Sequence, residues 1–242
     1  MKGKRFWIIG ASSGIGHALA NAMVSSGITL ILSSRNEEKL KDLNKTLPIP
    51  QQILPLDIKN PDQVIQAVSQ VGALDGVVIM SAIYSPPQRV DRLDIAQVAD
   101  IIQTNITGVI HVVSSVLPLL KPKGQLAVCA SVAGYVGLPL GQPYSATKAA
   151  LINFMESVKV ENPDMHIQVI NPGFVKTPMT DQNNFNMPMI ITPAQAAQHI
   201  IKGLKQKHFE IHFPTTFTRY MKLLKLLPYR LYFLITKQLV KN

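Results

Sequence analysis

Cysteine is almost absent from this chain, because Cys129 is the only one among 242 residues. One thiol cannot form an internal disulfide, so nothing points to an oxidising compartment. Cys129 lies in the apolar run 125–130, and we expect a buried strand thiol there rather than a reactive one. The six histidines show no metal-ligand spacing, so we expect no metal site.

Acidic residues are also scarce. The chain has 14 Asp and Glu against 24 Lys and Arg, a formal net charge of +10. This excess favours anionic partners: a phosphorylated cofactor, an acidic carrier protein, an anionic membrane or a nucleic acid. Nothing but charge points to a nucleic acid, and we expect none.

Long apolar runs are missing too, since none reaches the ~18 uncharged residues of a membrane-spanning helix. The N-terminal segment 1–5 is basic. A short strand and a glycine turn follow it, instead of an apolar segment with a cleavage site. We therefore expect a cytoplasmic protein.

The chain does have a regular alternation of short apolar runs and longer amphipathic stretches. The predicted strands are Arg5–Gly10, Ile28–Ser34, Gln52–Asp57, Asp75–Met80, Gln125–Ser131, His166–Ile170 and Phe209–Phe213. The predicted helices are Gly14–Ser25, Glu37–Thr46, Pro61–Val71, Ile95–Leu117, Tyr144–Val160 and Pro193–Lys205. This alternation predicts an α/β fold, a single doubly wound Rossmann-type domain with a seven-stranded parallel sheet over residues 1–213.

A glycine-rich turn directly follows the first predicted strand and opens a helix. Gly10, Gly14 and Gly16 follow the pattern G-x-x-x-G-x-G. Glycines allow close backbone approach to a pyrophosphate, and a helix N-terminus supplies free N–H groups and partial positive charge. Such turns also serve merely to join a strand to a helix, but the flanking strand and helix favour cofactor binding.

The end of the second predicted strand carries information about the cofactor. An NAD site usually has an acidic residue there to bind the ribose 2′-hydroxyl. This chain reads Ser33-Ser34-Arg35-Asn36, with no carboxylate. The guanidinium of Arg35 suits a 2′-phosphate, so we expect NADP(H), although a solvated loop arginine is the simpler interpretation.

Tyr144 and Lys148 are four residues apart at a predicted helix start, and so share one helical face. Alone, this spacing is common in amphipathic helices. Together with the other motifs, the chain closely resembles the short-chain dehydrogenase/reductase family over residues 4–213. The resemblance rests on Gly10, Gly14, Gly16, Asp57, Asn105 in Thr104–Gly108, Ser131 in Ala130–Gly134, Tyr144, Lys148, Asn171-Pro172-Gly173 and Thr177.

The resemblance implies a catalytic set. Tyr144 would be the general acid, or the base in the reverse direction, with its pKa of about 10 lowered by the Lys148 ammonium and the positive nicotinamide ring. Lys148 would also hold the nicotinamide ribose. Ser131 would bind the substrate oxygen, and Asn105 would hold a water that links Lys148 to solvent.

The resemblance also implies a cofactor site. Asp57 would bind the adenine amino group, and Thr177 the nicotinamide carboxamide. The full expected cofactor set is Gly10, Ser12, Ser13, Gly14, Ile15, Gly16, Arg35, Asp57, Ile58, Ala82, Asn105, Tyr144, Lys148, Pro172, Gly173, Val175 and Thr177. A homodimer or homotetramer built on Ile95–Leu117 and Tyr144–Val160 is expected from the same resemblance.

One segment departs from the family pattern. Where the family carries Asn-Asn-Ala-Gly after its fourth strand, this chain reads Ile79-Met80-Ser81-Ala82. Two amides are replaced by apolar side chains, and the final glycine has gained a methyl group. We expect an altered cofactor approach near Ala82 and retained activity.

The segment Thr177–Thr192 lacks periodicity and is rich in Asn, Met and Pro, which is typical of a lid. Its apolar side chains, Met179, Phe185, Met187, Met189 and Ile190, together with Val132, Tyr135 and Leu138, suit a moderately apolar carbonyl or secondary alcohol. Ordinary loop packing explains the same residues.

Residues 214–242 form a basic and apolar extension, predicted as two short helices with a break at Pro228. Two interpretations stay open: peripheral contact with an anionic membrane, or a tail packed on the body or on a partner subunit. The leading function is an NADP(H)-dependent carbonyl reductase or alcohol dehydrogenase. The alternatives are a 3-oxoacyl-carrier-protein reductase, or a non-catalytic cofactor-sensing or membrane-binding protein.

Overall fold

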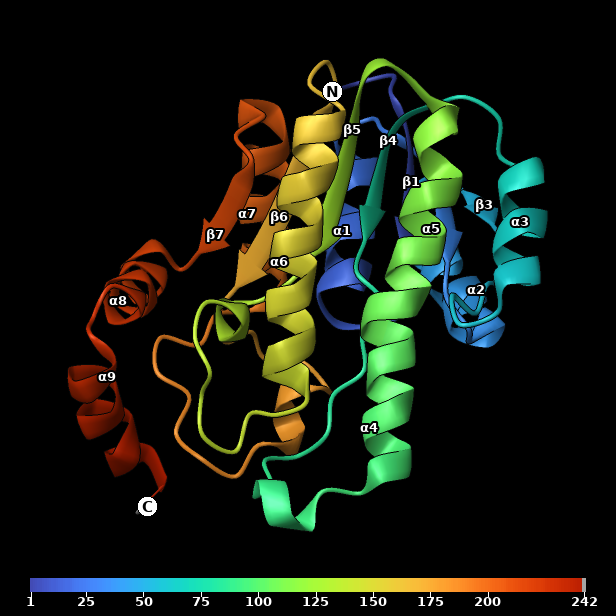
Figure 1. Ribbon diagram of the computed structural model, residues 1–242. Coiled ribbons are helices and arrows are strands. Elements are labelled where there is room, and N and C mark those ends of the chain that lie inside the picture. Colours follow the sequence, from blue (N-terminus) through green and yellow to red (C-terminus); the bar gives the residue numbers. More distant parts are fainter. Residues whose placement is uncertain (241–242) are drawn as a thin grey trace.

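The computed structural model describes residues 1–240, in which seven parallel strands form one sheet (Figure 1). The sheet order is β3-β2-β1-β4-β5-β6-β7. Their bounds are β1 Arg5–Ile9, β2 Thr29–Ser33, β3 Gln52–Ile53, β4 Leu74–Ile79, β5 Leu120–Cys129, β6 His166–Pro172 and β7 Glu210–Phe213. The predicted doubly wound parallel sheet is therefore confirmed.

Strand β1 shows why the sheet is covered on both faces. Phe6, Trp7, Ile8 and Ile9 are all fully buried. Because successive side chains point to opposite faces, Trp7 and Ile9 join one hydrophobic core while Phe6 and Ile8 join the other. The Trp7 indole donates a hydrogen bond to the Ser33 hydroxyl at 2.8 Å, so its polar atom is satisfied inside the core.

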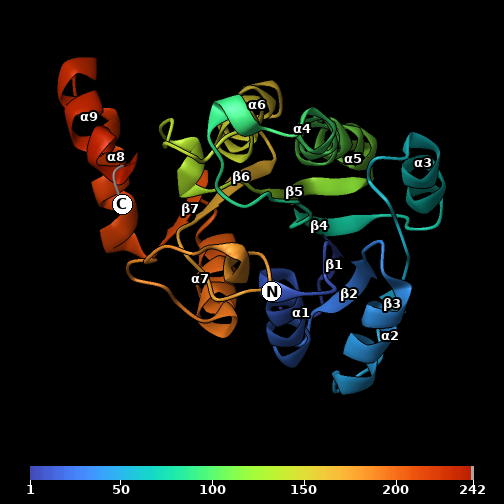
Figure 2. The same cartoon turned by 90° about the horizontal axis from the view of Figure 1, so that it is seen from below.

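Helices cover both faces of the sheet (Figure 2). One face carries α3 Pro61–Ser69, α4 Ile95–Ile102, α5 Val109–Val116 and α6 Tyr144–Glu161, and the other carries α1 Gly14–Ser25, α2 Glu37–Thr46 and α7 Pro193–Gln206. The start of α7 is fixed by a capping box, in which Thr192 and Gln195 each bind the other's backbone N–H, with Pro193 at the first position.

The predicted helix Ile95–Leu117 is interrupted in the structure. A π-helical segment, Gln103–Gly108, separates α4 from α5 and contains Asn105. The whole helical run Ile95–Leu119 is long and apolar enough, by length and composition, to cross a membrane, contrary to our expectation. The α5 valines of this run, however, are buried in the core between the helix and the sheet. A buried core helix can meet the same criteria of length and composition as a membrane-spanning helix.

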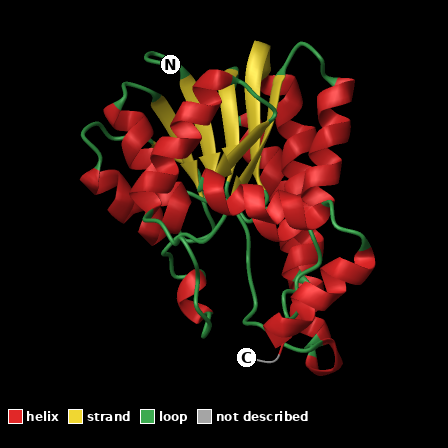
Figure 3. Ribbon diagram, turned by 90° about the vertical axis from the view of Figure 1, so that its left-hand side faces the viewer, coloured by secondary structure: helices red, strands yellow, loops and turns green. Residues whose placement is uncertain are grey.

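The predicted third strand, Gln52–Asp57, is shorter than expected, since only two residues pair with β2. The carboxyl ends of all the strands point to one end of the molecule, where the long loops lie (Figure 3). Parallel sheets place ligand sites at this end.

The C-terminal extension forms the two predicted helices, α8 Thr215–Lys225 and α9 Tyr229–Thr236, with Pro228 directly before the second. Both lie beyond the β7 edge of the sheet (Figure 2). Residues 241–242 of the predicted extension lie outside the described residues.

Candidate active site

A cleft of about 390 Å³ opens at the carboxyl ends of the strands. The loops that follow β1, β2, β4, β5 and β6 all contribute to its walls. Seventeen of the eighteen predicted site residues line it: Gly10, Ser12, Ser13, Gly14, Ile15, Gly16, Arg35, Asp57, Ile58, Ala82, Ser131, Tyr144, Lys148, Pro172, Gly173, Val175 and Thr177. The structure thus brings residues far apart in sequence to one cavity.

The glycine turn is built as a dinucleotide cradle requires. Gly10 has φ +96°, and a Cβ there would lie 2.5 Å from the Ser81 nitrogen. A Cβ on Gly16 would lie 2.0 Å from the Gly10 carbonyl oxygen, so only glycine fits either position. Within residues 1–240, the backbone N–H groups of residues 13–16 donate no hydrogen bond to the chain. These free donors at the start of α1 fit a pyrophosphate.

The segment that departs from the family pattern begins inside β4. Ile79 is the last residue of this strand and is buried in the core, in agreement with the predicted strand Asp75–Met80. Met80, whose N–H donates to the Ile9 carbonyl at 2.7 Å, continues the strand pairing. The Ser81 backbone still packs against Gly10. Ala82 lines the cleft, so the altered side chains leave the backbone wall of the cofactor site in place.

The end of the cleft beside β2 is rich in positive charge. Arg35, Asn36 and Lys39 line it together. Asn36 caps α2, because its side chain accepts a hydrogen bond from the Lys39 N–H at 2.9 Å, and this fixes Lys39 one turn into the helix. Asp57 lines the neighbouring wall and accepts from the Lys59 N–H at 3.0 Å. Our sequence reasoning did not name Lys39 as a site residue. Its position three residues after Asn36, near the start of a predicted helix, could have indicated it.

Ser131, Tyr144 and Lys148 lie at the other end of the cleft. Ser131 follows β5, and its hydroxyl oxygen accepts from the Ala133 N–H at 3.1 Å. Tyr144 begins α6, and the Lys148 Nζ lies 5.5 Å from the centroid of its ring. Lys148 is 1% exposed, and its Nζ donates to the Cys129 carbonyl at 2.8 Å. Helix α6 therefore delivers both groups to the exit of β5.

Burial shifts the pKa values of this pair. Burial raises the pKa of the Tyr144 phenol above its usual value, and the hydrogen-bonding contact with Ser131 acts in the opposite direction. Burial lowers the pKa of Lys148. The expected lowering of the Tyr144 pKa is thus not produced by the described residues alone. The positive charge of an oxidised nicotinamide bound in this cleft would act in the required direction.

Asn105 is the one predicted site residue that does not line the cleft. It is fully buried in the π-helical segment. Its side-chain oxygen accepts from the Ile83 N–H at 2.8 Å, and its amide donates to the Ile83 carbonyl at 2.9 Å and to the Thr147 hydroxyl at 3.2 Å. It therefore ties the loop after β4 to helix α6, between Tyr144 and Lys148.

Tyr84 contacts the candidate catalytic tyrosine, and our sequence reasoning did not name it. Its ring meets the Tyr144 ring edge-on, with centroids 5.1 Å apart. Its hydroxyl donates to the Asn183 side chain in the lid at 2.7 Å. Asn183 is 99 residues further along the chain, so no local pattern could have revealed this contact.

The two ends of the lid segment are held together by an isolated parallel β-bridge between Val175 and Ile191. Thr177 begins it with its hydroxyl 3.3 Å from that of Thr180, and both residues line the cleft. Among residues 1–240, no group of three or more His, Cys, Asp or Glu side chains gathers closely enough to hold a metal ion.

Comparison with known proteins agrees with this geometry. The family model described as short chain dehydrogenase matches residues 4–187. An uncharacterized oxidoreductase of Myxococcus xanthus is 31% identical over 232 residues, covering 91% of each chain. The 11-beta-hydroxysteroid dehydrogenase-like 4A of Arabidopsis thaliana is 30% identical over 84% of this chain and 74% of its own. An alcohol dehydrogenase from the archaeon Thermococcus sibiricus, complexed with 5-hydroxy-NADP, has a TM-score of 0.79 and 26% identity, covering 87% of this chain and 95% of that one. This chain belongs to the short-chain dehydrogenase family and is an oxidoreductase that uses a nicotinamide cofactor.

Proposed function

We propose that the protein is an NADP(H)-dependent reductase of moderately apolar ketones or aldehydes, or the matching dehydrogenase of secondary alcohols. One observation carries the proposal. A single cleft joins the cationic end at Arg35 and Lys39 to the proton-donating end at Ser131, Tyr144 and Lys148. When bound there, a nicotinamide supplies the hydride that goes to the carbonyl carbon.

The chain's own residues handle the proton and the developing charge. The Tyr144 phenol gives its proton to the carbonyl oxygen, which becomes the alcohol oxygen. The Ser131 hydroxyl donates to that same oxygen and stabilises its negative charge. The buried Lys148 ammonium, 5.5 Å from the Tyr144 ring centroid, favours the phenolate that remains.

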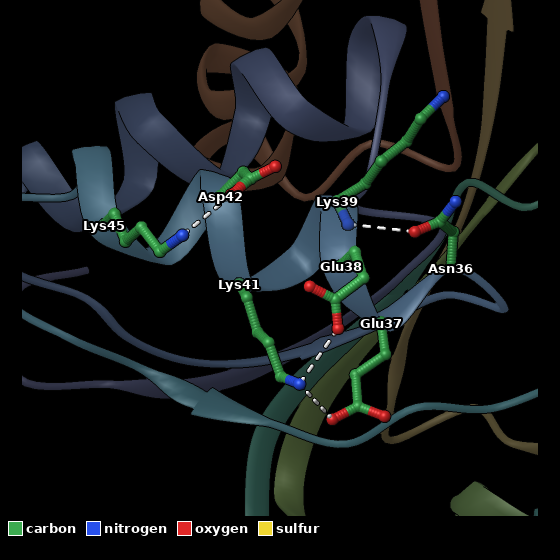
Figure 4. A network of polar contacts seen from close by, with 7 residues as sticks. All are labelled: Asn36, Glu37, Glu38, Lys39, Lys41, Asp42 and Lys45. Carbon is green, nitrogen blue, oxygen red and sulfur yellow. Dashed lines mark hydrogen bonds and ion pairs between the residues drawn. The ribbon is translucent and has the colours of Figure 1, made fainter.

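The preference for a 2′-phosphate is supported by how charges are distributed on α2. The Lys41 ammonium lies between the carboxylates of Glu37 and Glu38, at 3.1 and 3.0 Å (Figure 4). Lys39 points away from both carboxylates and makes no ion pair within the described residues (Figure 4). Its ammonium and the Arg35 guanidinium are therefore available for an anion.

The substrate class is supported by the apolar lid and by the names of relatives. Met179 lines the cleft, while Phe185, Met189 and Ile190 remain exposed on the lid. Relatives named as hydroxysteroid dehydrogenase-like proteins point to apolar alcohols and ketones.

A cofactor comparison tests this function. NADPH oxidation and NADH oxidation are each followed by nicotinamide absorbance over a panel of ketones, for the wild type and for Arg35→Ala, Lys39→Ala and Lys41→Ala. Losing a charged contact raises the KM for NADPH by roughly ten- to a hundredfold for the first two variants and leaves the KM for NADH within about twofold. Lys41→Ala is the matched control and leaves both unchanged. Equal changes in the KM for NADPH and the KM for NADH in the Arg35 variant would rule out a role of Arg35 in binding the 2′-phosphate.

A further inference from the structure

The C-terminal helices expose an unusual amount of apolar surface. Eight of the seventeen large apolar side chains that are exposed within residues 1–238 lie on α8, α9 and the turn between them. These eight are Tyr220, Leu223, Leu226, Tyr229, Leu231, Phe233, Leu234 and Ile235, and we call them the tail face. Leu226 and Tyr229 are each 78% exposed. Soluble surfaces rarely gather apolar side chains in this way without a binding role.

The inner faces of the same helices are already packed on the body, so body packing does not explain the tail face. Thr218, Met221, Tyr232 and Thr236 are buried. Met221 packs with Val132 and Tyr135 of the loop that follows the catalytic serine, and the Tyr232 hydroxyl donates to the Gly137 carbonyl.

A salt bridge between α8 and β7 holds α8 in this orientation. The Lys222 ammonium pairs with the Glu210 carboxylate on β7, which also accepts from the Tyr135 hydroxyl and, at 2.8 Å, from the Asn171 amide. These donors keep the pKa of Glu210 below its usual value although burial acts to raise it. The outer face of α8 is therefore held in a defined direction.

The charge around the tail face suits an anionic surface. Arg219, Lys225, Arg230 and Lys237 are exposed beside it. Glu210 is the last acidic residue of the chain, so the extension carries no carboxylate side chain. In a symmetric pair of copies these cations would meet cations, which disfavours a second copy as the occupant. Apolar and tyrosine side chains flanked by Lys and Arg instead match the headgroup region of an anionic bilayer.

The tail face lies beside the mouth of the cleft. Phe217 on α8 packs against Gly173 of the cleft wall, where a Cβ would lie 2.8 Å from its ring. Phe174 bridges Phe217, at 5.5 Å between ring centroids, to the lid residue Phe185, at 5.9 Å. The exposed lid side chains Phe185, Met189 and Ile190 thus continue the apolar surface toward the cleft.

We infer that the tail face docks on an anionic lipid bilayer and turns the cleft mouth toward it. The substrate is then a carbonyl compound or alcohol that partitions into the membrane. The inference that the tail face binds a bilayer does not depend on which reaction the protein catalyses. The substrate class, in contrast, rests on the proposed function.

Cosedimentation of the full chain with phosphatidylglycerol–phosphatidylcholine vesicles tests the docking. The wild type should bind these vesicles, bind phosphatidylcholine alone more weakly, and be released by high salt. The double variant Leu226→Glu, Leu234→Glu should bind at least about tenfold more weakly. The matched control Ile49→Glu, Ile65→Glu introduces two carboxylates at exposed apolar positions away from the tail and should bind as the wild type does.

Three results would overturn the docking. The first is no binding of the wild type to anionic vesicles. The second is equal loss in the tail and control variants, which would make the effect one of net charge. The third is a dimer, detected by sedimentation velocity, that the tail variant abolishes while vesicle binding is absent, because a second copy then covers the face.

A second arm separates docking from catalysis. NADPH oxidation is measured with a short water-soluble ketone and with a long-chain methyl ketone held in anionic vesicles. The tail variant should turn over the soluble ketone like the wild type and lose at least about fivefold on the vesicle-held ketone, since docking brings the cleft to the lipid. Turnover of both ketones without vesicle binding contradicts the docking alone. Vesicle binding without turnover of any ketone contradicts the proposed function alone.

Discussion

The Lys148 ammonium donates a hydrogen bond to the Cys129 carbonyl at 2.8 Å from a position that is 1% exposed. A fully buried lysine is rare, because burial disfavours the charged form. The pKa of Lys148 is lowered by that burial. The protein thus keeps a destabilising group at the exit of β5, which is typical of a functional site.

Lys148→Met removes the buried charge and keeps the shape of the side chain. We expect this variant to lose at least about 100-fold in kcat and to unfold at a higher urea concentration than the wild type near pH 7. The folded-state pKa of Lys148 lies below its unfolded value of 10.5, so between these two values the unfolded state binds more protons. The free energy of unfolding of the wild type therefore increases relative to that of the variant as the pH rises through this window. If the difference in the free energy of unfolding between the two proteins stayed constant up to pH 10.5, the lowered pKa of Lys148 would be contradicted.

The tie between Asn105 and Ile83 makes a prediction about stability. Asn105→Leu leaves the Ile83 N–H and carbonyl without partners, and each buried unsatisfied group costs about 1–3 kcal/mol. Urea unfolding should show a loss of about 2–6 kcal/mol for the two groups together. The neighbouring Thr104 hydroxyl is buried and has no hydrogen-bond partner among the described residues. Thr104→Val should therefore be neutral or stabilising, and a loss equal to that of Asn105→Leu would refute this account.

The contact between Tyr84 and Asn183 links the lid to the ring that packs against Tyr144. Tyr84→Phe keeps the ring against Tyr144 and releases the lid. We expect kcat/KM to fall about two- to tenfold, the range of one net hydrogen bond. Asn183→Ala should match it, and the double variant should show no further loss if both changes remove the same contact. Additive losses would mean that the two side chains act separately.

The fold could be predicted from sequence because its signals are local. Continuous apolar runs such as β1 and the capping residues around Pro193 are readable within a few positions. The break in Ile95–Leu117 could not be predicted, because the π-helical segment is stabilised by contacts from Asn105 to Ile83 and Thr147, 22 and 42 residues away.

The same distinction holds for the site. The glycine turn, Ser131, Tyr144 and Lys148 belong to motifs with family spacing, and the structure brings them to one cleft. Tyr84 and Glu210 belong to no motif, and only the folded chain shows their contacts with the lid and with α8. Ile79 lies inside the predicted strand Asp75–Met80, and the structure confirms it as a strand residue at the end of β4.

The central claim is that Tyr144 transfers the proton, and Tyr144→Phe tests it most directly. The measurement is kcat for a ketone with NADPH, alongside calorimetric NADPH affinity, in this variant and in the matched control Tyr220→Phe on the exposed tail. We predict a fall in kcat of about 100- to 10,000-fold for Tyr144→Phe, with NADPH affinity intact, and no change for Tyr220→Phe. A kcat of Tyr144→Phe within a few-fold of the wild type would contradict the account.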